Sequence, residues 1–164
     1  MKKIIFISFI IFFSICSRSW ALPDCPGSPL DIHNQKEFEA ITWHNCEGII
    51  LIKGLEEDPN ALSKYDGEWE NGEQNGQGTS TFNDGAKYIG EWKSGLHHGK
   101  GTYIWADGTK YVGEHKYHWQ DGNGIMYYND GRVSVGTWIE GEFFGKEYAP
   151  GEYDPSLYFG EQEE

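Results

Sequence analysis

Glycine recurs with a period of 23 residues in the second half of the chain. Between Tyr65 and Gly145 there are 17 glycines, and all of them fall on five positions of this period. A repeat of this length is typical of a stacked array of small units, each of which needs its neighbours to bury its apolar face. Full copies begin at Tyr65, Tyr88 and Tyr111, and a partial copy begins at Ser134.

Each copy has the sequence pattern of a β-hairpin. In the second copy, Tyr88, Gly90 and Trp92 alternate, which places their side chains on one face of a strand. Ser94-Gly95 opens the loop of this hairpin, and Asp107-Gly108 predicts a tight turn into the next copy because glycine accommodates a positive φ. The returning strand carries a second alternating set: Gly99, Gly101, Tyr103 and Trp105. A helix with this glycine density would lose about 1 kcal/mol per glycine relative to alanine, so β structure is predicted.

Large rings alternate with these glycines, which predicts how the sheet packs. Each flat ring can lie over a neighbouring glycine that has no side chain to obstruct it. We therefore expect an aromatic row on one face, made of Tyr65, Trp69, Phe82, Tyr88, Trp92, Tyr103, Trp105, Tyr111, Tyr128 and Trp138. We expect most of these rings to pack against one another and to form the core of the sheet. Because a single sheet has no second layer, part of the row is expected to stay open, as suits peptide docking or sugar stacking.

The pattern YxGxW, followed by GxxxGxG, by Asp-Gly and by the next Tyr, resembles the MORN repeat (membrane occupation and recognition nexus). The resemblance covers residues 65–147, divided into 65–87, 88–110, 111–133 and a partial copy at 134–147. It implies an all-β fold, in which successive hairpins form one elongated, slightly curved antiparallel sheet. It also implies a scaffold rather than an enzyme.

The third copy departs from this pattern. His115 stands where Trp69, Trp92 and Trp138 stand in the other copies, so either the face is looser there or a functional group lies in the aromatic row. Four histidines gather in this region: His97, His98, His115 and His118. A transition-metal site on adjacent loops is one reading. The favoured reading is that these histidines are ordinary polar loop residues, since no carboxylate–histidine spacing supports a set of metal ligands. No cofactor is expected.

The N-terminus has the three parts of a secretory signal peptide. Met1-Lys2-Lys3 is a positive start, Ile4–Ile15 is an apolar run, and Ser19-Trp20-Ala21 offers small residues at a cleavage site. The apolar run is shorter than the roughly 20 residues that span a bilayer. We expect residues 1–21 to be removed and the protein to be periplasmic or extracellular. An uncleaved anchor and a lipoprotein linked through Cys16 are the less favoured alternatives.

Residues 22–64 are expected to cap the array. Cys25 and Cys46 remain after removal of the leader, and an even cysteine count in an exported chain indicates a disulfide. Closing a loop of about 20 residues would contribute about 3 kcal/mol. Metal ligation is disfavoured because the CxxC spacing of zinc sites is missing. Further elements are expected here: a short helix at 36–41, a degenerate-repeat strand at 48–52 and a linker at 55–64. An acidic tail is expected at 148–164.

The charge balance of the chain disfavours some classes of binding partner. The chain has 13 basic and 26 acidic residues, a net charge of −13, so binding to nucleic acid or to anionic lipid is disfavoured. No GxSxG elbow or phosphate-binding loop is present, and carboxylate pairs such as Glu68/Glu70 are expected to be solvated. We expect no catalytic residues. The predicted function is an exported, non-catalytic module whose aromatic face binds a protein partner, one of basic character. Glycan or envelope-polymer binding on the aromatic row and membrane association are the alternatives.

Overall fold

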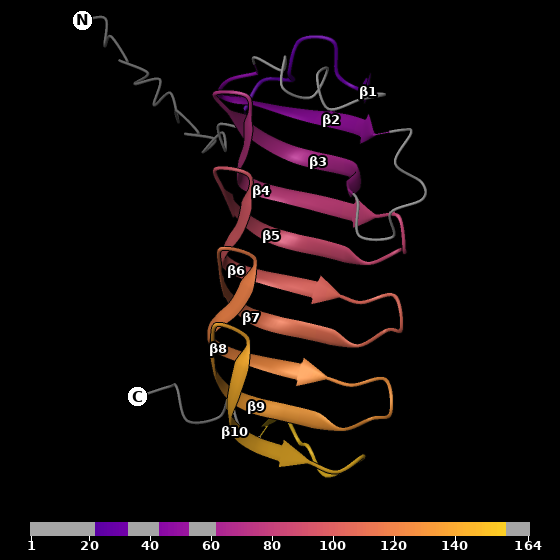
Figure 1. The fold of residues 1–164 in the computed structure, drawn as a ribbon, viewed down its shortest axis with the longest axis vertical. Helices are drawn as coiled ribbons and strands as arrows, with labels where there is room; N and C mark the ends of the chain where they lie inside the picture. Colours follow the sequence, from indigo (N-terminus) through magenta and orange to yellow (C-terminus); the bar gives the residue numbers. More distant parts are fainter. Residues whose placement is uncertain (1–21, 33–42, 53–61, 157–164) are drawn as a thin grey trace, which may run out of the picture.

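The computed structural model describes residues 22–32, 43–52 and 62–156. These residues form one ten-stranded sheet whose strands follow one another in sequence order (Figure 1). The strands are β1 (Leu30–Ile32), β2 (Cys46–Ile52), β3 (Leu62–Glu70), β4 (Glu73–Phe82), β5 (Lys87–Lys93), β6 (Leu96–Ile104), β7 (Lys110–Lys116), β8 (Trp119–Tyr127), β9 (Val133–Ile139) and β10 (Glu142–Tyr148). The predicted all-β array of antiparallel hairpins is confirmed, and only β1 and β2 pair in parallel.

Two kinds of turn alternate along the sheet. Two-residue turns close the hairpins at 71–72, 94–95, 117–118 and 140–141, and both residues of each have positive φ, as the I′ geometry requires. In the second hairpin these values are 48° for Ser94 and 75° for Gly95. The predicted Asp-Gly turns connect one hairpin to the next. There, for example, the Gly108 N–H donates to the Trp105 carbonyl over 3.0 Å.

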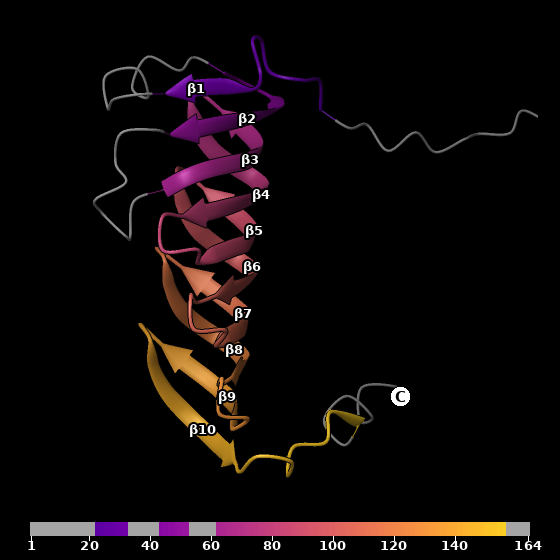
Figure 2. The ribbon, with the colours of Figure 1, turned by 90° about the vertical axis from the view of Figure 1, so that its right-hand side faces the viewer.

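The strands bend sharply toward the face that carries the rings. The ring centroids of Tyr65 and Trp69 lie 5.1 Å apart although the two residues are four positions apart in β3. A flat strand would separate them by about 13 Å. The bend coincides with a register shift in each of the first three hairpins, at which the returning strand (β4, β6 or β8) has two more residues than the strand it pairs with. Bulges of this kind bend the hairpin locally. The sheet is therefore curved around its inner, ring-bearing face (Figure 2).

The predicted contact between rings and glycines is confirmed in every full copy. A Cβ atom added to Gly78 would lie 2.6 Å from Tyr65 Cζ, and one added to Gly101 would lie 2.6 Å from Tyr88 Cζ. The same relation holds in the third copy, between Gly124 and Tyr111. Each tyrosine hydroxyl then reaches the bend. The Tyr88 hydroxyl, for instance, donates to the Glu91 carbonyl over 2.9 Å.

A glutamate at the bend of each full copy has a structural role. The Glu91 carboxylate accepts the Lys100 N–H over 2.9 Å, and Glu114 accepts the Asn123 N–H over 2.7 Å. Glu68 lies against Gly76 in the same way, since a Cβ on that glycine would lie 2.7 Å from Glu68 Cδ. The expectation of a merely solvated Glu68/Glu70 pair was therefore wrong for Glu68, while Glu70 is exposed.

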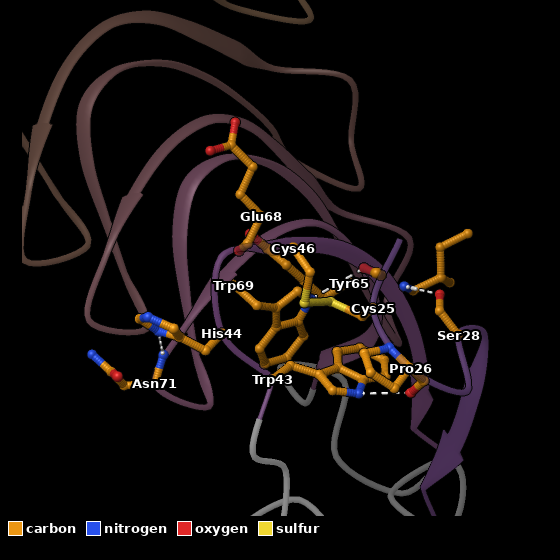
Figure 3. Close-up of a disulfide and its surroundings, with 12 residues drawn as sticks. Cys25, Pro26, Ser28, Trp43, His44, Cys46, Tyr65, Glu68, Trp69 and Asn71 are labelled. Atoms are coloured by element: carbon orange, nitrogen blue, oxygen red, sulfur yellow. Dashed lines mark hydrogen bonds between the residues drawn. A yellow bond between two sulfur atoms is a disulfide. The ribbon is translucent and has the colours of Figure 1, made fainter. Parts of the chain in front are cut away.

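The N-terminal end of the sheet is capped as predicted. Cys25 and Cys46 form a disulfide, and β2 pairs antiparallel with β3 (Figure 3). Trp43 lies against Trp69 with ring centroids 5.3 Å apart, and its indole N–H donates to the Pro26 carbonyl over 2.8 Å. The cap thus covers the first ring of the array.

Replacing Cys25 and Cys46 together by serine is expected to lower the free energy of unfolding by about 3 kcal/mol, because the disulfide closes a 21-residue separation. Urea unfolding of the double variant and of the oxidised parent measures the difference. Reduction of the parent should give the same loss. If oxidised and reduced parent unfold at the same urea concentration, the disulfide does not stabilise the cap.

Several boundaries differ from the prediction or fall outside the described residues. β3 begins at Leu62, so the predicted linker to residue 64 overlaps a strand by three residues. The helix expected at 36–41, the signal peptide and residues 157–164 lie outside the described residues. The described part of the tail folds back, placing the Tyr153 ring 5.4 Å from Tyr148 and 6.3 Å from Tyr127.

Candidate functional site

A continuous series of touching rings runs along the inner face of the sheet. We call it the aromatic spine: Trp43, Trp69, Tyr65, Trp92, Tyr88, His115, Tyr111, Trp138 and Phe143. Successive centroids are 4.7 to 5.4 Å apart, and all pairs but the last meet edge to face. This is the favoured arrangement of aromatic quadrupoles, so the spine supplies the core that a single sheet otherwise lacks.

Six of the ten rings of the predicted aromatic row belong to the spine and are buried: Tyr65, Trp69, Tyr88, Trp92, Tyr111 and Trp138. The three tyrosines are 0% exposed, and burial raises the pKa of each phenol. The indole N–H of Trp92 donates to the Gly78 carbonyl over 3.2 Å. These six side chains hold the repeats together, and a ligand can reach the aromatic face only at its remaining members.

The remaining members lie beside the spine, toward the Asp-Gly turns. Phe82, Tyr103, Trp105 and Tyr128 are half-buried, and we call these four the aromatic rim. Tyr103 contacts Trp105 with centroids 4.7 Å apart and Phe82 with centroids 6.1 Å apart. Trp105 follows β6 directly instead of extending it, which places it at the start of a turn.

A column of carboxylates borders this rim. Asp84, Asp107 and Asp130 occupy equivalent positions in the three Asp-Gly turns, and all three are exposed. Each accepts the backbone N–H two residues further along the chain, over 2.8, 2.9 and 3.0 Å respectively. One oxygen of each is thus used to fix the turn. The repeat places one such carboxylate at the rim every 23 residues, and at the third turn Asp130 is paired with Arg132 Nε over 2.8 Å.

Two of the four histidines are buried beside Tyr88. His97 stacks on Tyr88 at 3.8 Å between centroids, and His115 meets the same ring edge-on at 5.0 Å. Both are 3% exposed, and none of their four ring nitrogens has a hydrogen-bond partner. Burial lowers the pKa of His97 to about 2, with further lowering by His118 and His115, and burial lowers the pKa of His115 to about 4.

The other two histidines point to backbone groups. His118 Nδ1 accepts the His97 N–H over 3.3 Å, and His98 Nδ1 accepts the Gly99 N–H over 2.9 Å. Among the described residues, no three histidine, cysteine, aspartate or glutamate side chains are grouped as a metal site requires. Of the two readings of His115, the looser face is not what the structure shows, because His115 contacts both Tyr88 and Tyr111 at 5.0 Å.

The comparison with known families agrees with this geometry. The MORN repeat family model matches residues 65–87 and 88–110, the first two hairpin copies. The chain contains MORN repeats. MORN repeats are generally non-catalytic modules that mediate protein or membrane interaction. In the structure, β7–β10 continue the same hairpin architecture beyond the matched residues.

Two further findings complete the comparison. A search of curated proteins found no match to the chain. Within the ranges that the structure describes, no helix is long and apolar enough to cross a membrane.

Proposed function

We propose that this MORN protein is an exported, non-catalytic interaction module that binds a basic protein partner at its aromatic rim. The observation that carries the proposal is the partial exposure of the rim rings beside a spine that is buried at every ring except Phe143. The spine fixes the sheet, so the rim is displayed on a rigid support. Rigid aromatic side chains give large contact area at low cost in conformational entropy, and they are enriched at the centres of protein interfaces.

The charge of the molecule supports a basic partner. The net charge is −13, and the exposed carboxylates of Asp84 and Asp107 border the rim, whereas Asp130 is paired with Arg132. Complementary potentials speed association and orient the partner, and their effect falls as salt screens them. Export is supported by the leader-like sequence of residues 1–21 and by the disulfide, since disulfides persist in oxidising compartments.

Replacing Trp105 by alanine is expected to reduce capture of the partner about tenfold, because a half-buried indole supplies about 1 to 2 kcal/mol of contact at an interface. The measurement is a pull-down from an envelope extract at low and at high salt, with bound proteins quantified by mass spectrometry. Tyr103→Ala is expected to act in the same direction.

Phe144→Ala is the matched control, because Phe144 is an exposed ring on β10 and lies outside the rim. It should leave capture unchanged. If the parent and Trp105→Ala capture equal amounts of the partner, the aromatic rim is not the binding site. Retention on anionic liposomes, with no protein captured, would favour membrane association instead.

A further inference from the structure

The tip of the third hairpin, β7–β8, differs from the other three tips. The turns at 71–72, 94–95 and 140–141 all have glycine at their second position, whereas the third tip has His118 there. Tyr117 and His118 nevertheless adopt the same left-handed conformation, with φ of 52° and 71°. Non-glycine residues adopt this region at a cost. The tip thus keeps its shape despite its sequence.

The same tip exposes two large rings. Tyr117 is 61% exposed and Trp119 is 58% exposed, whereas the residues that follow the turn in the first and last hairpins are Glu73 and Glu142. The Trp119 ring lies along the neighbouring tip, since a Cβ added to Gly141 would be 3.1 Å from Trp119 Cε3. One edge of the indole is therefore supported by the next hairpin while more than half of the side chain meets solvent.

These rings line a hollow with charged walls. Its volume is about 500 Å³, and its lining consists of Lys116, Tyr117, Trp119, Asp121 and Glu140. A hollow of this size holds one large side chain. Asp121 accepts the Glu140 N–H over 3.4 Å, which ties the two tips together. Two carboxylates against one ammonium leave the hollow with a net negative charge.

The rings already have a cation beside them. The Lys116 Nζ atom lies 5.8 Å from the Tyr117 centroid. Tyr117 also meets the ring of His98 edge to face, with centroids 6.2 Å apart. Tyrosine and tryptophan faces attract cations, and Asp121 and Glu140 supply hydrogen-bond acceptors. A guanidinium group uses both features at once, because it stacks on aromatic faces and donates to carboxylates in a planar fork.

We propose that this hollow binds an arginine side chain of a basic partner segment. The guanidinium stacks on Trp119 and donates to the carboxylates of Asp121 and Glu140, while Lys116 weakens the site by like-charge repulsion. The inference deepens the proposed function, because it names a second contact point for a basic partner. The site lies at the hairpin tips, away from the Asp-Gly turns that border the aromatic rim.

The test uses a fluorescein-labelled heptapeptide with three arginines separated by glycine and serine, titrated against the purified protein by fluorescence anisotropy. Trp119→Ala is expected to weaken binding about tenfold, and Asp121→Asn about fivefold. Lys116→Gln should tighten binding about threefold, since it removes the competing cation. Trp119→Phe keeps an aromatic face and should retain most of the affinity, and thermal unfolding of each variant checks that it folds.

Glu73→Gln is the matched control, because it removes one negative charge at the exposed tip of the first hairpin. It should change the affinity less than twofold. Weakening by Glu73→Gln equal to that by Asp121→Asn would overturn the proposal in favour of non-specific charge attraction, and so would weaker binding by Lys116→Gln. Binding of the neutral tetrasaccharide cellotetraose that depends on Trp119 would also overturn it, because the site would then be a glycan site.

The two proposals fail separately. If peptide binding depends on Trp119 but partner capture does not depend on Trp105, the tip binds arginine and the aromatic rim is not the partner's binding site. If Trp119→Ala leaves peptide binding unchanged while Trp105→Ala abolishes partner capture, the arginine site at the tip is wrong and the aromatic rim is supported.

Discussion

Replacing Gly101 by alanine is expected to lower the free energy of unfolding by about 4 kcal/mol, near the upper end of overpacking effects. The added Cβ would lie 2.6 Å from both Tyr88 Cε2 and Tyr88 Cζ. Tyr88 cannot move aside cheaply, because it is 0% exposed, is stacked on His97 and donates its hydroxyl to a backbone carbonyl. Across the strand pairs, Gly101 faces Gly90 and Gly113, so the Tyr88 ring is the group that a Cβ at this position would meet.

Gly108→Ala provides the comparison. A Cβ at this position meets no atom within 4 Å, and only its φ of +87° opposes the change. We expect a loss of about 1 kcal/mol there. Urea unfolding followed by circular dichroism measures both variants against the parent. If Gly101→Ala and Gly108→Ala prove equally stable, the ring-over-glycine contact is not what holds neighbouring repeats together.

Acidification from pH 7 to pH 4.5 is expected to lower the free energy of unfolding by about 5 kcal/mol through His97 and His115. Burial lowers their folded pKa values to about 2 and about 4, whereas an unfolded histidine titrates near 6.5. Below pH 6.5 the unfolded chain therefore binds protons that the folded chain does not. Stability is fully present above that pH and falls by about 1.4 kcal/mol per pH unit for each histidine.

His115→Trp isolates this effect from the titration of carboxylates, because tryptophan occupies the equivalent position in the other copies. The variant keeps a spine ring and removes one of the two buried bases. Its loss of stability between pH 6.5 and 4.5 should be smaller than that of the parent by about 2.5 kcal/mol. The titratable groups that face the pair are Tyr88, Tyr103, Tyr111 and His118, and the burial-lowered pKa of His118 acts in the same direction. Parallel stability–pH curves for parent and variant would contradict the assignment.

The sequence predicted the features that depend on neighbouring residues. The Asp-Gly turns and the position of the Ser94-Gly95 turn follow from local backbone preferences, so both could be predicted. The contact of Tyr88 with Gly101 also follows from alternation, because Gly101 lies two residues from Tyr103, the cross-strand partner of Tyr88, and therefore shares its face as a diagonal neighbour. The disulfide followed from cysteine count and context.

The features that depend on curvature could not be predicted in this way. The 23-residue period gives the spacing of the rings, but a flat sheet would leave Tyr65 and Trp69 far apart and half-exposed. The bulges bring them together and convert most of the predicted binding row into core. His97 was expected in a loop. Because the turn has only two residues, β6 begins at Leu96 and His97 already faces inward.

The site at the third hairpin tip was also not predicted, although the sequence of its turn differs from that of the other three. Tyr117 lies in the one described hairpin turn that lacks glycine at its second position, and Trp119 follows that turn. The departures of this copy from the pattern predicted only a looser face, a functional group in the aromatic row or a histidine metal site. The hollow itself depends on Glu140 and Asp121, which come from adjacent hairpins and are brought together by strand order.

The two ends of the spine are fastened differently. Trp43 is 7% exposed and lies next to a covalent link, whereas Phe143 at the far end is half-buried on the last strand. Terminal units of a linear array open more readily than internal ones. We therefore expect transient opening to begin at β9–β10, where the tail contacts Tyr148 and Tyr127 through Tyr153 without a covalent link, and to proceed toward the disulfide-linked end. The turn at Gly141, which supports Trp119, belongs to the β9–β10 hairpin. An arginine bound between the two tips would therefore also stabilise this hairpin against opening.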